Sequence, residues 1–286
     1  MGVTAREALA EAERRLAAAG VETPRVDAEW LVAHLLGTTR SGLATRLDDE
    51  VPTGAEGAGV FPPGIAGSAG DASSTGLEPL LERREAREPL AYVLGEWGFR
   101  RLTLKTDARA LVPRPETETL VERTLTLAEG FEWPRILDVG VGSGAIALAL
   151  KDERPDARVT GVDVSPDALL LARENADRLG LEVELRQGDG AAAAAEGWDV
   201  VVANPPYVES LEDVQPELRW EPKVALVGRG EHERLARAAD AAFVVLEVGD
   251  GQAPEVAAVL RRLGYADIAI TADLTGRDRV VEGRLP

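Results

Sequence analysis

The sequence predicts an α/β fold, in which a mostly parallel sheet is flanked by helices and preceded by a small helical domain. Two observations support this prediction. From residue 113 to the C-terminus, short apolar runs alternate with helical patterns, as they do in parallel sheets with crossover helices. The first 87 residues instead carry amphipathic helical patterns. A length of 286 residues and a hydrophobic fraction of 45% allow one large or two modest packed domains.

Residues 1–87 are predicted to form the helical domain. Thr4 and Glu7 have the spacing of a capping box, and they open an amphipathic helix that Gly20 ends. Residues 51–76 are rich in Gly, Pro, Ser and Ala, so we expect a flexible insertion there. Further helices are predicted over residues 24–36, around Leu43 and Leu47, and over residues 77–87.

Residues 88–112 are predicted to be a β-hairpin-like connector between the two domains. Strands are expected over residues 92–94 and 102–106, where short apolar runs occur. Pro115 then suits the first turn of a helix, because its fixed φ angle is already helical and it needs no backbone donor. The second domain is therefore predicted to span residues 113–286.

A glycine loop near the start of the second domain predicts a cofactor site. Residues 136–139 form a predicted buried strand, and a helix is predicted over residues 145–150. A second strand, over residues 158–162, ends in Asp163, which lies 19 residues after Gly144. That spacing is close to the ~20 residues expected for a carboxylate that binds ribose hydroxyls. The pattern predicts a nucleoside cofactor held by the loop residues Gly140, Val141, Gly142, Ser143 and Gly144.

The same loop argues against a dinucleotide cofactor. It reads G-x-G-x-G, so the pyrophosphate-binding G-x-G-x-x-G pattern is not reproduced, and the chain has no G-x-x-x-x-G-K-[ST] phosphate loop. A third strand, over residues 183–187, is followed by Gly188, Asp189 and Gly190. Asp189 can accept a hydrogen bond from an adenine amino group, although a plain Asp-Gly turn has the same sequence.

Polar side chains at successive strand ends are predicted to meet at one edge of the sheet. They are Asp138, Asp163, Asp189 and Asn204, and ligands of open α/β sheets bind at that edge. The best-fitting ligand is S-adenosylmethionine, with Asp138 or the glycine loop near its amino-acid end. Asn204 would then border the cofactor as well.

The apolar run Val200-Val-Val-Ala203 stops abruptly at Asn204-Pro205-Pro206-Tyr207, and this turn predicts the catalytic and substrate-binding residues. Two prolines fix two φ angles and remove two donors, while the Asn204 side-chain oxygen and the Pro205 carbonyl remain acceptors. Together they can hold a planar amino group, which Tyr207 can cover with its ring. We predict that Asn204, Pro205 and Tyr207 are catalytic and that Asn204, Pro205, Pro206 and Tyr207 bind the substrate. A simple strand-ending turn is the structural alternative.

The rest of the domain continues the alternation. Later strands are predicted over residues 243–248, 266–270 and 279–282, with a helix over residues 253–263. Because no helical pattern separates the last two strands, we expect them to pair as an antiparallel hairpin.

Several motifs in this order resemble those of the protein-(glutamine-N5) methyltransferases that modify peptide-chain release factors, the PrmC/HemK family. They are Pro113-Arg-Pro-Glu-Thr-Glu118, the glycine loop, Asn204-Pro-Pro-Tyr207 and Glu221-Pro222. Glu88-Pro-Leu-Ala-Tyr-Val-Leu-Gly95 and Leu246-Glu-Val-Gly249 also resemble family segments. The likeness covers residues 88–286 well and the N-terminal part more loosely.

This resemblance implies a seven-stranded Rossmann-like class I methyltransferase domain with S-adenosylmethionine as cofactor. It implies methyl transfer to the side-chain amide nitrogen of the glutamine in the Gly-Gly-Gln loop of release factors, with residues 1–87 as the docking domain. Two departures stand out: Val141 occupies a position where the family usually has threonine, and residues 228–247 are shorter than usual. We expect the shorter region to be repacked.

Composition narrows the class of protein. There is no cysteine, and only His34 and His232 could supply imidazole, so no metal site is expected. No signal-like core or apolar run of ~18 residues occurs, which favours a cytoplasmic protein outside membranes. The formal net charge of −18 disfavours a nucleic-acid substrate and is compatible with a protein partner. We expect a monomer that acts on release factors.

Two alternatives remain open from the sequence. Asn-Pro-Pro-Tyr also occurs in adenine-N6 DNA methyltransferases, so adenine-N6 or guanine-N2 methylation of nucleic acid is one. The other is a non-catalytic module that binds S-adenosylmethionine without transferring the methyl group.

Overall fold

The computed structural model describes residues 2–52, 76–208, 210, 212 and 214–286. It divides the chain into two compact units, one of residues 1–96 with 215–220 and one of residues 97–214 with 221–286. Most of the predicted insertion, residues 53–75, lies outside the described residues.

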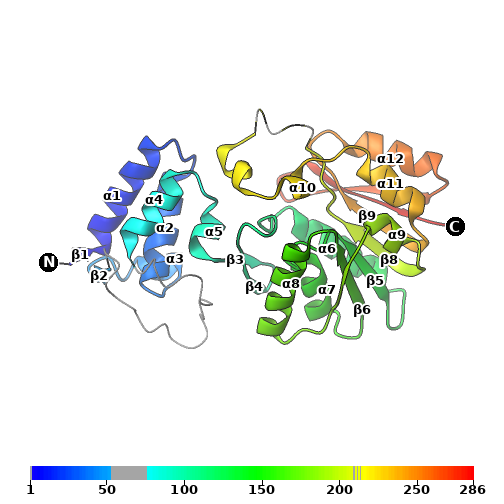
Figure 1. The fold of residues 1–286 in the computed structure, drawn as a ribbon, viewed down its shortest axis with the longest axis horizontal. Helices are drawn as coiled ribbons and strands as arrows, with labels where there is room; N and C mark the ends of the chain where they lie inside the picture. Colours follow the sequence, from blue (N-terminus) through cyan, green and yellow to red (C-terminus); the bar gives the residue numbers. More distant parts are fainter. Residues whose placement is uncertain (1, 53–75, 209, 211, 213) are drawn as a thin grey trace. The chain divides into compact units, whose positions relative to one another are not determined.

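The first unit is helical, as the sequence predicts (Figure 1). Its predicted capping box is present: the Glu7 N–H donates to Thr4 Oγ1 at 3.3 Å, and the Thr4 N–H donates to Glu7 Oε2 at 3.0 Å. Two short strands, β1 (Val3–Thr4) and β2 (Glu50–Val51), pair antiparallel beside the helices. The helices are α1 (Ala5–Ala18), α2 (Pro24–Leu35), α3 (Arg40–Leu43), α4 (Leu77–Glu85) and α5 (Leu90–Leu94).

Two predictions in this unit are wrong in detail. Residues 92–94, predicted as a strand, belong to helix α5, which ends at Gly95 with φ +77° and an N–H bond to the Ala91 carbonyl at 3.0 Å. A five-residue apolar run is too short for its periodicity to separate a strand from a buried helical turn. The third helix, α3, ends at Leu43 and does not reach Leu47.

Residues 215–220 belong to the first unit, although in the sequence they come between strands β8 and β9 of the second unit. They include a 3₁₀ helix, η1 (Pro216–Trp220). The Glu217 carboxylate accepts hydrogen bonds from Arg87 Nε at 2.7 Å and from Arg84 Nη2 at 2.9 Å. Arg84 also pairs with Asp27 at 2.7 Å, and both of those side chains are buried. The two contacts of Glu217 thus join η1 to Arg84 of α4 and to Arg87 just after it.

The second unit contains a seven-stranded sheet in the order β10-β11-β9-β8-β5-β6-β7. All pairings among β9, β8, β5, β6 and β7 are parallel, and β11 is antiparallel to both of its neighbours. The predicted α/β class and the C-terminal hairpin are therefore confirmed. The strands are β5 (Arg135–Val139), β6 (Arg158–Asp163), β7 (Glu184–Gln187), β8 (Trp198–Ala203), β9 (Ala241–Glu247), β10 (Ala266–Ala272) and β11 (Asp278–Arg284).

Helices cover both faces of this sheet (Figure 1). Successive side chains of a strand point to opposite faces, so Ile136 of β5 packs in one core and Leu137 in the other. This explains why the central strands read as continuous apolar runs rather than alternating ones. One face carries α6 (Thr117–Ala128), α7 (Ala145–Glu153) and α8 (Pro166–Leu179), and the other carries α9 (Gly190–Ala194), α11 (Glu231–Ala238) and α12 (Ala253–Arg262).

The region that is shorter than in the resembling family has a compact connection. Helix α11 ends at Ala238 and β9 begins at Ala241, so Ala239 and Asp240 form the link. The Asp240 N–H donates to the Ala194 carbonyl at 2.9 Å, and the Asp240 carbonyl accepts from the Trp198 N–H at 2.8 Å. Both backbone groups of Asp240 are thus satisfied, and the short link is compatible with an intact sheet.

A separate two-stranded sheet, β3 (Glu96–Phe99) with β4 (Leu102–Lys105), precedes the large sheet along the chain.

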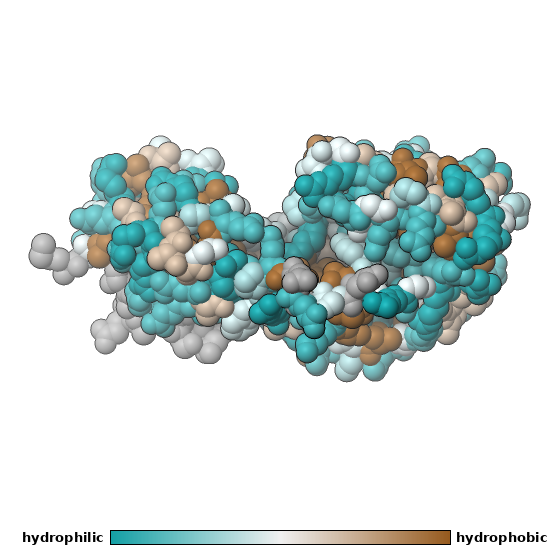
Figure 2. All heavy atoms as spheres, turned by 90° about the horizontal axis from the view of Figure 1, so that it is seen from above, coloured by the Kyte–Doolittle hydropathy of each residue, from teal (hydrophilic) through white to brown (hydrophobic). Residues whose placement is uncertain are grey.

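The face of the molecule seen in Figure 2 is mostly hydrophilic, with apolar residues in small scattered groups. Among the helices that the structure describes, none is both long and apolar enough to cross a membrane.

Candidate functional site

A cavity of about 340 Å³ opens at the carboxyl ends of the central strands in the second unit, a size within the range of ligand sites. It lies where the sequence predicts the polar strand ends to meet. The predicted site residues that line it are Gly140, Val141, Gly142, Ser143, Asp163, Asp189, Gly190, Asn204, Pro205 and Pro206. Asp138, Gly144 and Tyr207 were predicted for the site as well, and they are not among its lining residues.

The glycine loop wraps closely around the end of β5. Gly140, Gly142 and Gly144 have φ values of +77°, +55° and +88°, a region of backbone conformation that favours glycine. The Gly140 and Val141 N–H groups both donate to the Val162 carbonyl, at 2.8 and 3.1 Å. A Cβ atom at Gly144 would lie 2.9 Å from a methyl carbon of Leu148, so the first turn of α7 also needs glycine there. At its glycines the loop therefore offers only backbone atoms, with no side chain, to its surroundings.

Asp163 ties this loop to the end of β6. Its Oδ2 atom accepts from the Gly142 N–H at 3.0 Å, and its Oδ1 atom accepts from the Ser165 N–H at 2.9 Å. Each carboxylate oxygen has more than one lone pair, so both can accept a further hydrogen bond from a hydroxyl group. The carboxylate is thus held in a fixed orientation at the cavity wall.

Asp189 lies at the rim of the cavity with both oxygens engaged. Oδ1 caps α9 by accepting from the Ala192 N–H at 2.9 Å, and Oδ2 pairs with Arg234 of α11. The Ala192 N–H and the Arg234 guanidinium lower the pKa of Asp189, which keeps the carboxylate charged. Its predicted contact with an adenine amino group stays a prediction, and such a contact would share this carboxylate with Arg234.

Asn204 follows the last residue of β8 and points into a polar contact with α6. Its Nδ2 atom donates to Thr117 Oγ1 at 3.3 Å. This bond uses the donor end of the amide, which leaves Oδ1 as the end that can accept. The turn that carries Asn204 is fixed further along the chain, where the Val208 N–H donates to the Leu226 carbonyl at 2.9 Å.

Tyr207 packs away from the cavity. A Cβ atom at Gly249 would lie 2.9 Å from Cδ2 of the Tyr207 ring, so glycine at that position lets the ring approach the turn after β9. Gln252 Nε2 donates to the Tyr207 carbonyl at 3.4 Å. Burial raises the pKa of the Tyr207 phenol. The predicted role of its ring over a substrate amide stays a prediction.

Asp138 lies beneath the glycine loop and is fully buried. Its Oδ2 atom accepts from the Ala147 N–H at 3.0 Å, in the first turn of α7. Burial raises the pKa of Asp138 to about 7. In the structure this carboxyl group supports the helix that follows the loop, and its predicted direct contact with the cofactor stays a prediction.

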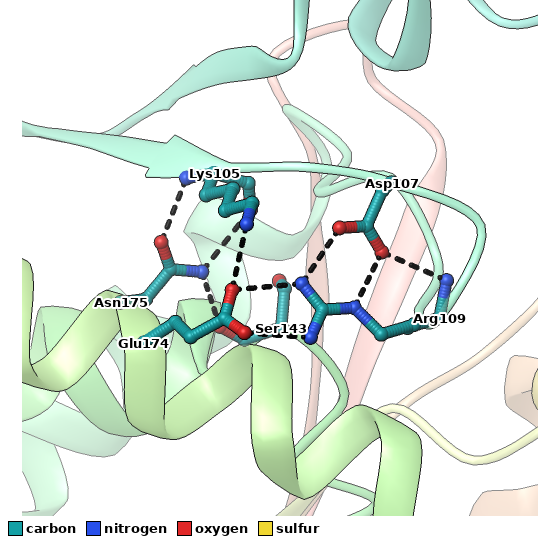
Figure 3. A network of polar contacts seen from close by, with 6 residues as sticks. All are labelled: Lys105, Asp107, Arg109, Ser143, Glu174 and Asn175. Atoms are coloured by element: carbon teal, nitrogen blue, oxygen red, sulfur yellow. Dashed lines mark hydrogen bonds and ion pairs between the residues drawn. The ribbon is translucent and has the colours of Figure 1, made fainter. Parts of the chain in front are cut away.

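A polar network holds the outer side of the loop (Figure 3). Asn175 of α8 accepts from the Lys105 N–H at 2.7 Å and donates to the Lys105 and Ser143 carbonyls at 3.1 and 2.9 Å. Beside it, Glu174 pairs with Lys105 and with Arg109, each at 2.8 Å. Arg109 and Lys105 together lower the pKa of Glu174 to about 2. The network joins β4, α8 and the loop.

Sequence reasoning missed two buried acidic residues that do not line the cavity but lie next to residues that do. Glu221 is buried and accepts from the Val112 N–H at 3.0 Å and from Arg114, although burial raises its pKa. Glu247, at the end of β9, is 1% exposed. Both residues stand in motifs that the family resemblance identified, Glu221-Pro222 and Leu246-Glu-Val-Gly249. The sequence alone could not predict the contacts with distant residues that place each of them next to the site.

Comparisons with known proteins show sequence similarity to a methyltransferase family. Residues 117–231 match the family model of the methyltransferase small domain, and residues 7–57 match that of the PrmC N-terminal domain. A protein of Deinococcus radiodurans, named release factor glutamine methyltransferase, is 41% identical over 98% of this chain and 98% of its own length. A protein of the same name from Vibrio cholerae is 39% identical over 99% of this chain and 98% of its own.

A solved structure shows likeness of fold only. The catalytic domain of hMettl16, solved in complex with the MAT2A 3'UTR hairpin 6, matches 64% of this chain and 75% of its own with a TM-score of 0.52. Its sequence is 13% identical.

Proposed function

The chain belongs to the release factor glutamine methyltransferase family, and we propose that its acceptor is the glutamine of the Gly-Gly-Gln loop in peptide-chain release factors. It is an S-adenosylmethionine-dependent methyltransferase, and the product would be a glutamine methylated on its side-chain amide nitrogen. The observation that carries the proposal is the joint placement of Asn204, Pro205 and the glycine loop around one cavity.

The cavity suits the cofactor of the family. When bound, S-adenosylmethionine supplies an electrophilic methyl group on a sulfonium. Asp163 has a fixed carboxylate with spare lone pairs for ribose hydroxyls, and the backbone of the glycine loop can accommodate the amino-acid end. Gly190 lines the cavity and packs tightly against the end of β5, because a Cβ atom there would overlap Val139 Cγ1 at 2.2 Å. We propose these residues as the cofactor-binding set, together with Asp189 at the rim.

The chemistry needs positioning more than acid or base catalysis. A glutamine amide nitrogen is a weak nucleophile, because its lone pair is delocalised into the carbonyl. Asn204 Oδ1 and the Pro205 carbonyl would accept the two N–H groups and so aim the nitrogen at the methyl group. The same two acceptors would stabilise the positive charge that develops on the nitrogen. The proton can leave to solvent afterwards, so no dedicated general base is assigned.

We also propose a division of labour along the chain. Residues 1–87 would bind the release factor, and residues 113–286 would transfer the methyl group. Residues 88–112 would connect these two domains. The match of residues 7–57 to the PrmC N-terminal model supports a specialised role for the first of these. A net charge of −18 favours a protein over a nucleic acid as partner, and we propose a monomer that acts in the cytoplasm.

A direct competition between substrate classes tests the proposal. The full-length protein is incubated with labelled S-adenosylmethionine and equal concentrations of a bacterial release factor, tRNA and double-stranded DNA. Label in the release factor alone is the expected result. Label in a nucleic acid would favour the amino-methylating alternative, and cofactor binding without transfer to any of the three would favour a non-catalytic module.

A further inference from the structure

A buried carboxyl group lies next to the proposed catalytic amide. In the parallel pairing of β8 and β9, Ala203 is the partner of Leu246. Asn204 and Glu247 each follow by one residue, so the two side chains leave adjacent strands on the same face. That face is the one covered by α6, whose first residue is Thr117. Three residues distant in the sequence therefore meet at one point.

The chemistry of these three side chains determines which group donates and which group accepts each hydrogen bond. Asn204 Nδ2 donates to Thr117 Oγ1 at 3.3 Å. The Thr117 hydroxyl and the Asn204 amide both favour the charged form of the neighbouring Glu247 carboxyl group and oppose the rise in its pKa that burial causes. A carboxylate can only accept, so the Thr117 hydroxyl must donate to it. The lone pairs of Thr117 Oγ1 are then available to the Asn204 amide, which must present its NH₂ group to this side.

We propose that Glu247 is a positioning residue, whose carboxylate fixes, through Thr117, which end of the Asn204 amide faces the substrate. With Nδ2 held by Thr117, Oδ1 is the end left to accept an N–H group of the substrate glutamine. If the Asn204 amide were flipped, its NH₂ group would face the N–H group of the substrate glutamine. Two donors cannot form a hydrogen bond, so the substrate would not be held. The inference rests on the proposed function, since it deepens the role given there to Asn204.

The surroundings of Glu247 make its charge state adjustable. Burial raises the pKa of Glu247 to about 7, the Thr117 hydrogen bond and the Arg279 charge oppose that rise, and Glu116 adds to it. Tyr207 also faces the carboxyl group, and His232 of α11 contacts the Glu247 backbone carbonyl through Nε2 at 2.8 Å. Within the described part of the chain, Glu247 Oε2 is buried without a hydrogen-bond partner.

If Glu247 became protonated, the donor and acceptor roles of Thr117 and Asn204 would no longer be fixed. A protonated carboxyl group can donate, so the Thr117 hydroxyl would be free to turn and the Asn204 amide free to flip. The ionised form is the competent one, and its fraction increases as pH rises. We therefore expect kcat to rise through about pH 7 and then to level off, while the KM for S-adenosylmethionine changes little.

Kinetics of matched variants test the inference. Glu247→Gln should lower kcat about 10-fold to 100-fold and abolish the rise near pH 7, because Gln is neutral throughout. Thr117→Val should lower kcat similarly, whereas Thr117→Ser keeps the hydroxyl and should retain activity. Thr124→Val is the control: Thr124 is buried on the same helix, but its hydroxyl donates to the Leu120 carbonyl at 2.8 Å. A Glu247→Gln enzyme that keeps the wild-type pH profile would overturn the inference.

A second measurement does not depend on turnover. In the full-length protein, NMR follows the Glu247 carboxyl carbon and the Asn204 side-chain NH₂ signals from pH 5 to 9. Both should titrate with one midpoint, and Thr117→Val should weaken their coupling. If the Asn204 signals did not shift while Glu247 titrates, this would contradict the relay, that is, the proposed coupling of Glu247 to Asn204 through Thr117. If the wild-type protein methylates no release factor, the proposed function fails, and this titration still decides whether the relay exists.

Discussion

At the scale of single residues, the proposed mechanism depends on hydrogen-bond acceptors rather than on a charged acid or base. Asn204 and Pro205 are uncharged, and the prolines that flank the Pro205 carbonyl have no N–H group to compete for it. Among the ionisable groups, Asp163 orients the backbone of the glycine loop, and Glu247 is proposed to orient Asn204. This arrangement suits a substrate amide that needs alignment more than activation.

Removing the side-chain acceptor should therefore affect rate more than cofactor binding. We expect Asn204→Ala to lower kcat by about 100-fold to 1000-fold, the range seen when one preorganised hydrogen-bond partner of a transition state is lost. The dissociation constant for S-adenosylmethionine, measured by calorimetry, should change by less than about fivefold. Gln187→Ala is a control, because Gln187 is an exposed amide outside the cavity. Near-normal turnover by Asn204→Ala would remove Asn204 from the mechanism.

How far the sequence predicts individual site residues depends on the kind of contact. The loop residues and Asp163 could be predicted, because strand ends of a parallel sheet share one edge whatever the tertiary detail. Thr117 and Glu247 could not, since the role proposed for them depends on a meeting of α6, β8 and β9 that no local spacing encodes. Tyr207 shows the opposite case: it stands in the motif, yet its ring packs on the turn at Gly249.

At the scale of elements, the turn from β7 to α9 lines the cavity and packs closely against the end of β5. A Cβ atom at Gly190 would lie 2.2 Å from Val139 Cγ1, whereas one at Gly188 would meet only Val162 Cγ2 at an ordinary 3.7 Å. We expect Gly190→Ala to lower the free energy of unfolding by about 1–3 kcal/mol, as overpacking does, and to weaken cofactor binding. Urea denaturation and calorimetry would measure both effects.

The neighbouring glycine provides the control for that experiment. Gly188→Ala should change the free energy of unfolding by less than about 1 kcal/mol, the usual range away from packing clashes. Adding Val139→Ala to Gly190→Ala should restore part of the loss, because it removes the overlapping methyl group. Equal effects of the two glycine substitutions would contradict the account of this turn.

The Asn175 contacts join three elements through a single amide. Asn175→Ala would leave the Lys105 N–H and the Lys105 and Ser143 carbonyls without their side-chain partner in a buried site. We expect a loss of about 2–3 kcal/mol in the free energy of unfolding and weaker binding of S-adenosylmethionine. Arg173→Ala, an exposed position on the same helix, should have little effect on either quantity. Binding unaffected by Asn175→Ala would mean that the loop does not need this support.

Whole elements were easier to predict than their short connections. The strands of the large sheet are apolar runs between turn residues, and the pairing of β10 with β11 follows from the lack of a helical pattern between them. Helix α5 was mistaken for a strand because five residues show less than two helical turns. Residues 215–220 could not be assigned to the first unit, because the ion pairs of Glu217 are contacts between segments distant in sequence.

At the scale of the whole molecule, stability and activity should respond to pH in opposite directions. Burial raises the pKa values of Asp138 and Glu247 to about 7, above their ordinary values of 3.8 and 4.5. The folded protein then binds more protons than the unfolded chain between those values. The stabilising contribution of both groups is fully present below about pH 4 and is lost as pH rises through 7. The proposed role of Glu247 requires its charged form, so activity should rise over the upper part of that range.

A pair of isosteric variants separates this effect from general charge effects. We expect the Tm difference between Glu247→Gln and wild type to shift in favour of the variant from pH 5 to pH 8, because only wild type acquires a buried charge. Glu174→Gln is the control, since Arg109 and Lys105 hold the pKa of Glu174 at about 2 and it stays charged across that range. Its Tm difference from wild type should be constant. A constant difference for Glu247→Gln as well would show that Glu247 does not titrate there.

The central claim, that the Asn204 turn directs methyl transfer to a glutamine amide, is tested most directly by tandem mass spectrometry of a bacterial release factor. The factor is incubated with S-adenosylmethionine and either the wild-type protein or Asn204→Ala. The account predicts a gain of one methyl group on the glutamine of the Gly-Gly-Gln loop with wild type and its near absence with the variant. A methyl group on any other residue, or equal methylation by both proteins, would contradict it.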